Sequence, residues 1–208
     1  MLSRGMNATK FPGQVAACLA GLLALAAASA DEPALATETL TLDSARSSAA
    51  FSVKVLWMFA VDGHFGNLHG NVSVDRFRGQ ATVDARIETA TVTMRRDGAL
   101  AWVKSAEFFD VARYPEIRFH SEAFPLTRLR LGGQVPGALT MRGVTRPVIF
   151  NVAPSSCARP AVECPIEATG SVRRGEFGMS TRRATLADRV ELSFSIRIVE
   201  APQSAAKS

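Results

Sequence analysis

Apolar and polar residues alternate strictly over several segments of this 208-residue chain. Every second residue from Val190 to Ile198 is apolar, and the residues between them are Glu, Ser, Ser and Arg. Val83–Ile87 and Ile117–Phe119 repeat the pattern, and so does Phe51–Trp57 apart from Leu56. Because neighbouring side chains of a β-strand point to opposite faces, each segment is predicted to be a strand with one dry and one wet face.

Turn signals separate these strands and predict their connections. The pair Val135–Met141 and Val144–Val152 is typical of a hairpin over an Arg142–Thr145 turn. Residues 99–109 lack Gly and Pro and carry apolar residues at helical spacing, so they predict one short helix. Many strands, one helix and no βαβ alternation indicate an all-β sandwich or an up-and-down antiparallel β-barrel.

The N-terminus carries the features of a secretory signal peptide. Arg4 and Lys10 precede an apolar run over residues 15–28, and Ala28-Ser29-Ala30 supplies small residues before Asp31. This order is typical of a cleaved leader, which predicts a signal peptide over 1–30 and a single exported domain over 31–208. An N-terminal anchor and acylation at Cys18 are the alternatives, although a lipoprotein box would follow the apolar run rather than open it.

Cysteine and charge usage agree with export. Without residues 1–30 the chain keeps Cys157 and Cys164, which bracket a proline-containing loop. In an oxidising compartment this spacing predicts one disulfide; a metal site and a redox pair are the alternatives, and neither C-x-x-C nor a nearby His supports them. The basic residues are scattered arginines with no aromatic residues interleaved for stacking on bases, so nucleic-acid binding is not expected.

The sequence lacks the common catalytic and metal-binding signatures. It contains no G-x-S-x-G, phosphate-loop, dinucleotide-binding or H-E-x-x-H motif. His64 and His69 are five residues apart and would face opposite sides of a strand, and Glu107 with Asp110 fits a helix end. No catalytic residue, metal site or required cofactor is therefore predicted, and an enzyme is disfavoured.

Phenylalanine is abundant where tyrosine is nearly absent. The chain has 12 Phe and one Tyr, so an inner face rich in Phe would suit a ligand without hydrogen-bonding groups. Ordinary core packing is the alternative, since an eight-stranded barrel can be filled by side chains or hold one narrow ligand. The candidate lining residues share inward positions on the predicted strands or lie near the ends of the cavity: Phe51, Val53, Val55, Trp57, Phe65, Ile87, Trp102, Phe119, Leu139, Met141, Phe150, Leu192 and Phe194.

Several ordered blocks resemble one known family. The stretches 42–47 and 51–54, the stretches 61–65 and 68–70, the block 104–115 (KSAEFFDVARYP), the block 137–148 (GALTMRGVTRPV) and the segments 173–179 and 186–192 are similar to the YceI-like polyisoprenoid-binding proteins. These blocks cover residues 40–199, nearly all of the chain after the leader.

The resemblance implies an extended lipocalin-like antiparallel β-barrel of about eight strands with one short helix. It also implies export to the periplasm and a bound isoprenoid lipid, either a quinone or a polyprenyl chain. The expected function is a non-catalytic carrier that supplies this lipid, with a membrane redox protein as a further partner. The alternatives are an enzyme acting on an isoprenoid or amphiphilic lipid, and a filled barrel with a protein-binding role.

Overall fold

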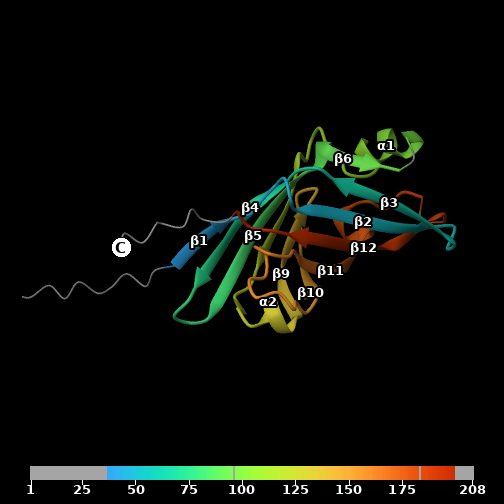
Figure 1. Ribbon diagram of the computed structural model, residues 1–208. Coiled ribbons are helices and arrows are strands. Elements are labelled where there is room, and N and C mark those ends of the chain that lie inside the picture. Colours follow the sequence, from blue (N-terminus) through green and yellow to red (C-terminus); the bar gives the residue numbers. More distant parts are fainter. Residues whose placement is uncertain (1–36, 96, 183, 200–208) are drawn as a thin grey trace, which may run out of the picture. The chain divides into compact units, whose positions relative to one another are not determined.

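The computed structural model describes residues 37–199 except positions 96 and 183, so the leader predicted over 1–30 lies outside the described residues. Strands dominate, and they form one antiparallel sheet (Figure 1). Its strands are β1 (Thr37–Thr41), β2 (Ser48–Val55), β3 (Phe59–Phe65), β4 (Leu68–Asp75), β5 (Gln80–Glu88), β6 (Val92–Met94), β7 (Glu116–Ser121), β8 (Phe124–Pro125), β9 (Gly133–Met141), β10 (Val144–Val152), β11 (Ile166–Arg173) and β12 (Leu186–Ile196).

The strands combine into a barrel because the first eight form four bent segments. Each bent segment consists of two consecutive strands separated by a few residues, and the four segments are β1–β2, β3–β4, β5–β6 and β7–β8. Each segment pairs with the next one along the chain. The single strands β9 to β12 continue the meander. Strand β12 then returns to β2, and a bridge between Leu42 and Ile198 extends this last seam. The predicted antiparallel barrel of about eight strands is thus confirmed.

The β9–β10 hairpin is confirmed, with a tighter turn than expected. Met141 pairs with Val144, which leaves Arg142 and Gly143 as a two-residue loop. Both have positive φ, 51° and 71°, as a type I′ turn requires. The turn twists in the same sense as the strands, so the long hairpin keeps its register.

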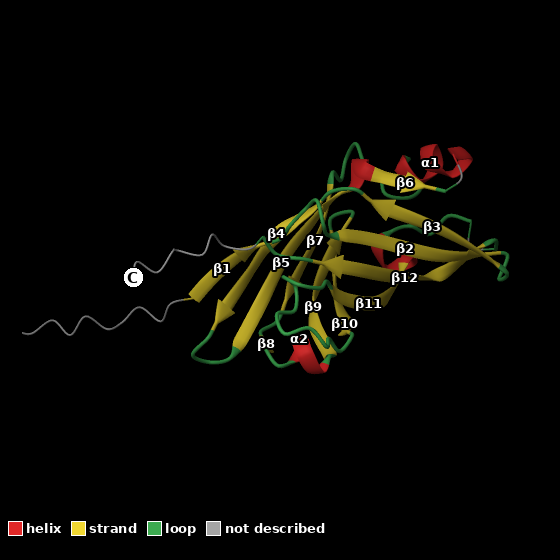
Figure 2. Cartoon of the chain, viewed as in Figure 1, coloured by secondary structure: helices red, strands yellow, loops and turns green. Residues whose placement is uncertain are grey.

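The helix prediction needs correction. Helix α1 spans Asp97–Lys104 and lies beside β6 (Figure 2), and it ends before the predicted limit at residue 109. The Ser105 hydroxyl and backbone N–H both bond to the Trp102 carbonyl, a local competition that ends helices. The chain then turns at residues 105–109, which buries Phe108 and Phe109. A second short helix, α2 (Arg128–Leu131), and two 3-10 turns, η1 (Thr89–Thr91) and η2 (Arg174–Phe177), were not predicted.

Strand β2 also ends earlier than the alternation suggested. Leu56 and Trp57 have left-handed backbone angles, φ 49° and 64°, so the strand stops at Val55. The turn leaves Trp57 77% exposed. The prediction that Trp57 shares the inner face of Phe51 is therefore wrong.

Candidate ligand-binding cavity

The barrel encloses a cavity of about 500 Å³, a size common among small-molecule sites. Its wall comes from the inward face of nearly every strand, and the side chains there are aliphatic, methionine or phenylalanine apart from two arginines. Several of these apolar residues, among them Val83, Phe119 and Phe194, remain only half buried. They line open space instead of packing fully against one another, so this barrel is not completely filled by side chains.

One wall of the cavity is a row of phenylalanines from three strands. The Phe150 ring centroid lies 4.9 Å from that of Phe119 and 5.0 Å from that of Phe194, both in edge-to-face geometry. Such contacts add about 0.5–1.5 kcal/mol each beyond area burial. The rings therefore hold one another in fixed positions along the cavity.

Glycines make room for these rings. An added Cβ at Gly170 would lie 2.5 Å from Phe150 Cδ1, and one at Gly137 would lie 2.6 Å from Phe119 Cε2. At the end of the cavity near α1, Gly63 pairs with Phe51 on the neighbouring strand. A Cβ added at Gly63 would lie 2.4 Å from the Phe51 ring. The missing side chains let the rings lie against the sheet, which widens the cavity.

The cavity is closed at the end where α1 lies. Phe51, Phe65, Phe108 and Phe109 form a cluster with centroid separations of 4.8–6.3 Å, and each is at most 6% exposed. Trp102 packs behind it, 5.1 Å from the Phe108 ring. Along β2 the lining reaches Phe51 and goes no further.

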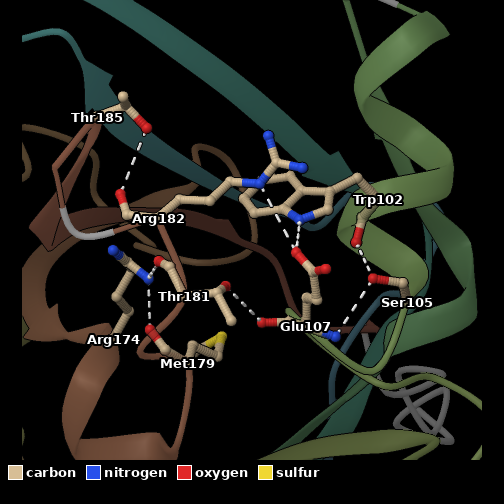
Figure 3. Close-up of polar contacts among 8 residues, drawn as sticks. All are labelled: Trp102, Ser105, Glu107, Arg174, Met179, Thr181, Arg182 and Thr185. Atoms are coloured by element: carbon tan, nitrogen blue, oxygen red, sulfur yellow. Dashed lines mark hydrogen bonds and ion pairs between the residues drawn. The ribbon is translucent and has the colours of Figure 1, made fainter.

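Polar contacts hold the closing segments in place (Figure 3). The indole nitrogen of Trp102 donates to Glu107, and the Thr181 hydroxyl donates to the Glu107 carbonyl. The fully buried Arg174 guanidinium donates to the carbonyls of Met179 and Thr181, while Met179 also lines the cavity. These bonds join the segment after α1 to the segment before β12.

The opposite end is the mouth of the cavity. Three segments surround it, and we call them together the mouth rim: the β4–β5 turn Arg76–Gly79, the segment Leu126–Leu131 that includes α2, and the loop Cys157–Cys164. Arg76 and Arg159 line the cavity here and are exposed to solvent, so the cavity opens at this end.

The predicted disulfide between Cys157 and Cys164 is confirmed, and it closes the third rim segment. This loop is also tied to the end of β12. The Ile198 N–H donates to Ala161, and the Arg197 guanidinium donates to Val162. The disulfide therefore holds Pro160, Ala161 and Val162 against the cavity.

Carboxylates partly offset the rim charges. Arg76 pairs with Glu38 at 2.6 Å, Arg78 with Asp75 at 3.1 Å, and Arg159 with Glu163 at 2.9 Å. A hydrogen bond from the Arg78 backbone N–H is the main cause that lowers the pKa of Asp75. The Arg159 side chain likewise lowers the pKa of Glu163.

The structure brings most of the predicted lining residues to this one cavity. Those that line it are Phe51, Phe65, Ile87, Phe119, Leu139, Met141, Phe150, Leu192 and Phe194. Val53 is buried in the core beyond Phe51, Val55 is half buried beside it, and Trp57 and Trp102 lie outside the wall. Whether the lining residues bind a ligand stays a prediction.

Sequence reasoning missed other parts of the wall. The helical spacing predicts a helix at Phe108 and Phe109, and the cysteine spacing predicts only a disulfide loop over Arg159–Val162, whereas all of these residues line the cavity. Phe124, Leu126 and Leu129 come from segments too short to show a periodicity. The only available signal was their apolar character.

Within the described part of the chain, no three His, Cys, Asp or Glu side chains are grouped so that they could hold a metal ion. None of the helices in that part is long and apolar enough to cross a bilayer. The cavity wall offers no paired acid and base and no nucleophile beside a base. The wall could therefore contact a ligand mainly through its apolar surface.

Comparison with known proteins agrees with this description. Residues 40–198 match the YceI-like domain family. A UPF0312 protein of Pseudomonas putida strain GB-1 is 28% identical over 144 residues, which cover 67% of this chain and 74% of that protein.

Two solved structures share the fold. BcnA of Burkholderia cenocepacia superposes with a TM-score of 0.58 at 20% identity, covering 76% of this chain and 99% of that one. A polyisoprenoid binding domain from Saccharophagus degradans, implicated in plant cell wall breakdown, gives a TM-score of 0.59 at 16% identity and covers 80% and 100%. With the family match spanning nearly the whole described barrel, the chain belongs to the YceI-like family.

Proposed function

We propose that this protein is a non-catalytic carrier that binds one long isoprenoid lipid in the barrel, and that it does so in the periplasm. The observation that carries the proposal is the almost entirely apolar cavity with one closed and one open end. A polyprenyl chain has no hydrogen-bonding groups, so it loses nothing by leaving water, and each buried CH₂ contributes about 0.8 kcal/mol.

The two ends of the cavity suggest how the lipid would lie. The closed end is lined by phenylalanines such as Phe51 and Phe109, which suits the tail. The mouth has the Arg76 and Arg159 side chains and solvent, which suits a polar head such as a quinone ring. The structural relative from Saccharophagus degradans, a polyisoprenoid binding domain, supports the same class of ligand. The predicted leader supports the location.

A carrier is favoured over an enzyme because the wall presents no catalytic constellation and the family includes binding domains. More specifically, we propose that the bound lipid is a quinone and that the protein delivers it to a membrane redox protein. An enzyme acting on the lipid is the competing function, and it predicts that the bound lipid is chemically converted over time.

The test is to extract the purified full chain, expressed with its leader, with organic solvent and to identify the lipid by mass spectrometry. We expect close to one isoprenoid molecule per protein, unchanged after prolonged incubation. An empty protein, or a lipid of another class, would contradict the proposal. A converted lipid would favour the enzyme.

Two neighbouring residues on β12 give a matched pair of variants. Phe194 lines the cavity and Ser193 faces outward and is exposed. Phe194→Asp places a carboxylate against hydrocarbon, at a cost of several kcal/mol, and should empty the cavity, whereas Ser193→Asp should leave the lipid content unchanged. Ala168→Phe, on the residue that pairs with Phe194, fills the cavity without adding charge and should also expel the lipid from a folded barrel.

A further inference from the structure

The mouth rim carries large apolar side chains that face solvent. Phe77, in the β4–β5 turn, is 83% exposed, and Leu131, the last residue of α2, is 77% exposed. Leu126 and Leu129 of the same segment line the cavity, so this segment presents leucines both to the cavity and to solvent. Exposed apolar residues gathered at an opening mark an interaction surface better than single scattered ones do.

The rim segments are fixed to one another by backbone hydrogen bonds. The Leu126 N–H donates to the Gly79 carbonyl at 2.8 Å, which joins α2's segment to the turn that carries Phe77. The Ser155 N–H donates to the Arg130 carbonyl at 2.9 Å, which joins α2 to the chain leading into the disulfide loop. The turn that carries Phe77 and the segment that carries Leu131 are therefore held together as parts of the same rim.

The mouth rim is also basic. It contains five arginines, at positions 76, 78, 128, 130 and 159, and one acidic residue, Glu163. Glu38 and Asp75 beside it pair with Arg76 and Arg78. Among the described residues no carboxylate forms an ion pair with Arg128 or Arg130, so the excess positive charge of the rim lies on α2, next to Leu131.

We propose that the mouth rim docks on a bilayer surface that contains anionic phospholipid, and that docking sets the cavity opening on the membrane. The inference rests on the proposed carrier function, which requires lipid to pass between a bilayer and the cavity. Phe77 and Leu131 would enter the boundary between headgroups and acyl chains, and the arginines would lie among the phosphates. A lipid tail could then enter without crossing water.

The opposite end of the barrel carries a second exposed apolar group, formed by Leu56, Trp57 and Met58 of the β2–β3 turn and by Phe59, the first residue of β3. This turn precedes β3 and the mouth turn follows β4, so the two turns lie at opposite ends of one bent segment (Figure 1). The phenylalanine cluster closes the barrel at that end. A membrane there would gain no access to the cavity, so this turn serves as the control.

The test measures co-sedimentation of the mature protein with vesicles of phosphatidylcholine alone and of phosphatidylcholine with an equal part of phosphatidylglycerol. We expect the protein to bind the anionic vesicles more strongly than the neutral ones. Binding should be lost in 1 M salt, because the Debye length there is only about 3 Å and the charges are screened. Arg130→Glu should weaken binding about 30-fold, since one basic residue near the surface contributes about 1 kcal/mol and the added acid costs as much again. Lys54→Glu, the same charge change at the opposite end, should have little effect.

The apolar contribution has its own matched pair. Phe77→Ser combined with Leu131→Ser should weaken vesicle binding about tenfold or more. Leu56→Ser combined with Phe59→Ser removes the same two residue types at the closed end and should not. Equal loss in both pairs, greater loss at the closed end, or no preference for anionic vesicles would overturn the docking proposal.

Measuring the lipid content of the same variants tests the docking proposal and the carrier function independently of each other. The rim variants should still bind isoprenoid added from solvent, because their cavity wall is intact. Rim-dependent vesicle binding by a protein that never holds lipid would refute the carrier and leave docking standing. A protein that holds isoprenoid but ignores vesicles would refute docking alone.

Discussion

The indole nitrogen of Trp102 donates a hydrogen bond of 2.7 Å to the Glu107 carboxylate (Figure 3). The Arg182 guanidinium lies 5.1 Å from the indole ring centroid and 3.7 Å from the same carboxylate. Trp102 thus links α1 to the segment before β12 from outside the barrel. This contact explains why a tryptophan close to the closed end does not enter the cavity.

Trp102→Phe should reduce the free energy of unfolding by about 1 kcal/mol, because it removes one hydrogen bond to a half-exposed carboxylate and keeps the ring against Phe108. Lipid content should not change. Urea unfolding measures the first effect and solvent extraction the second. Glu107→Gln is the control, since its amide oxygen can still accept the indole hydrogen bond. Loss of bound lipid in Trp102→Phe would mean that the indole reaches the cavity.

Reduction of the disulfide should lower stability by about 2–3 kcal/mol and leave the barrel folded, because Cys157 and Cys164 close a ring of only a few residues. Since the loop holds Ala161 and Val162 against the mouth, lipid should also dissociate faster. Thermal unfolding and lipid retention with and without reductant check both effects. Free thiols in the oxidised, denatured protein would show that the bond does not form.

The antiparallel barrel followed from the sequence because alternation and turn residues are local signals, as the β9–β10 hairpin illustrates. The cavity wall was predicted where it comes from long strands, as at Phe119 and Phe194. The prediction failed at Trp57 because alternation cannot show where a strand ends in a left-handed turn. It also missed Phe108, whose burial depends on the chain reversal after Ser105 and on contacts with distant strands.

The predicted signal peptide leads to a separate prediction about the N-terminus of the exported protein. Mature protein recovered from the periplasm should begin near Asp31, because Ala28-Ser29-Ala30 supplies the small residues that signal peptidase needs. N-terminal sequencing checks the cleavage site, and mass spectrometry checks Cys18. An intact leader or an acylated Cys18 would contradict it.

The glycines under the phenylalanine wall give the sharpest test of the cavity itself. A Cβ at Gly170 would lie 2.5 Å from the Phe150 ring, so Gly170→Ala must push that ring toward Phe119 and Phe194. We expect a loss of about 1–3 kcal/mol in unfolding free energy and less bound lipid, because the ring can move only inward. Gly98→Ala in α1, where the added Cβ would meet nothing within 4 Å beyond its chain neighbours and the helix's own backbone, should be neutral or slightly stabilising.

Combining Gly170→Ala with Phe150→Leu tests the cause of that loss. The smaller side chain removes the collision, so the double variant should be more stable than the sum of the two single changes predicts, with a coupling energy above about 0.5 kcal/mol. Unfolding in urea gives the four free energies of the cycle. Strictly additive effects would mean that Phe150 does not rest on Gly170, and that the width of the cavity does not depend on the missing side chain.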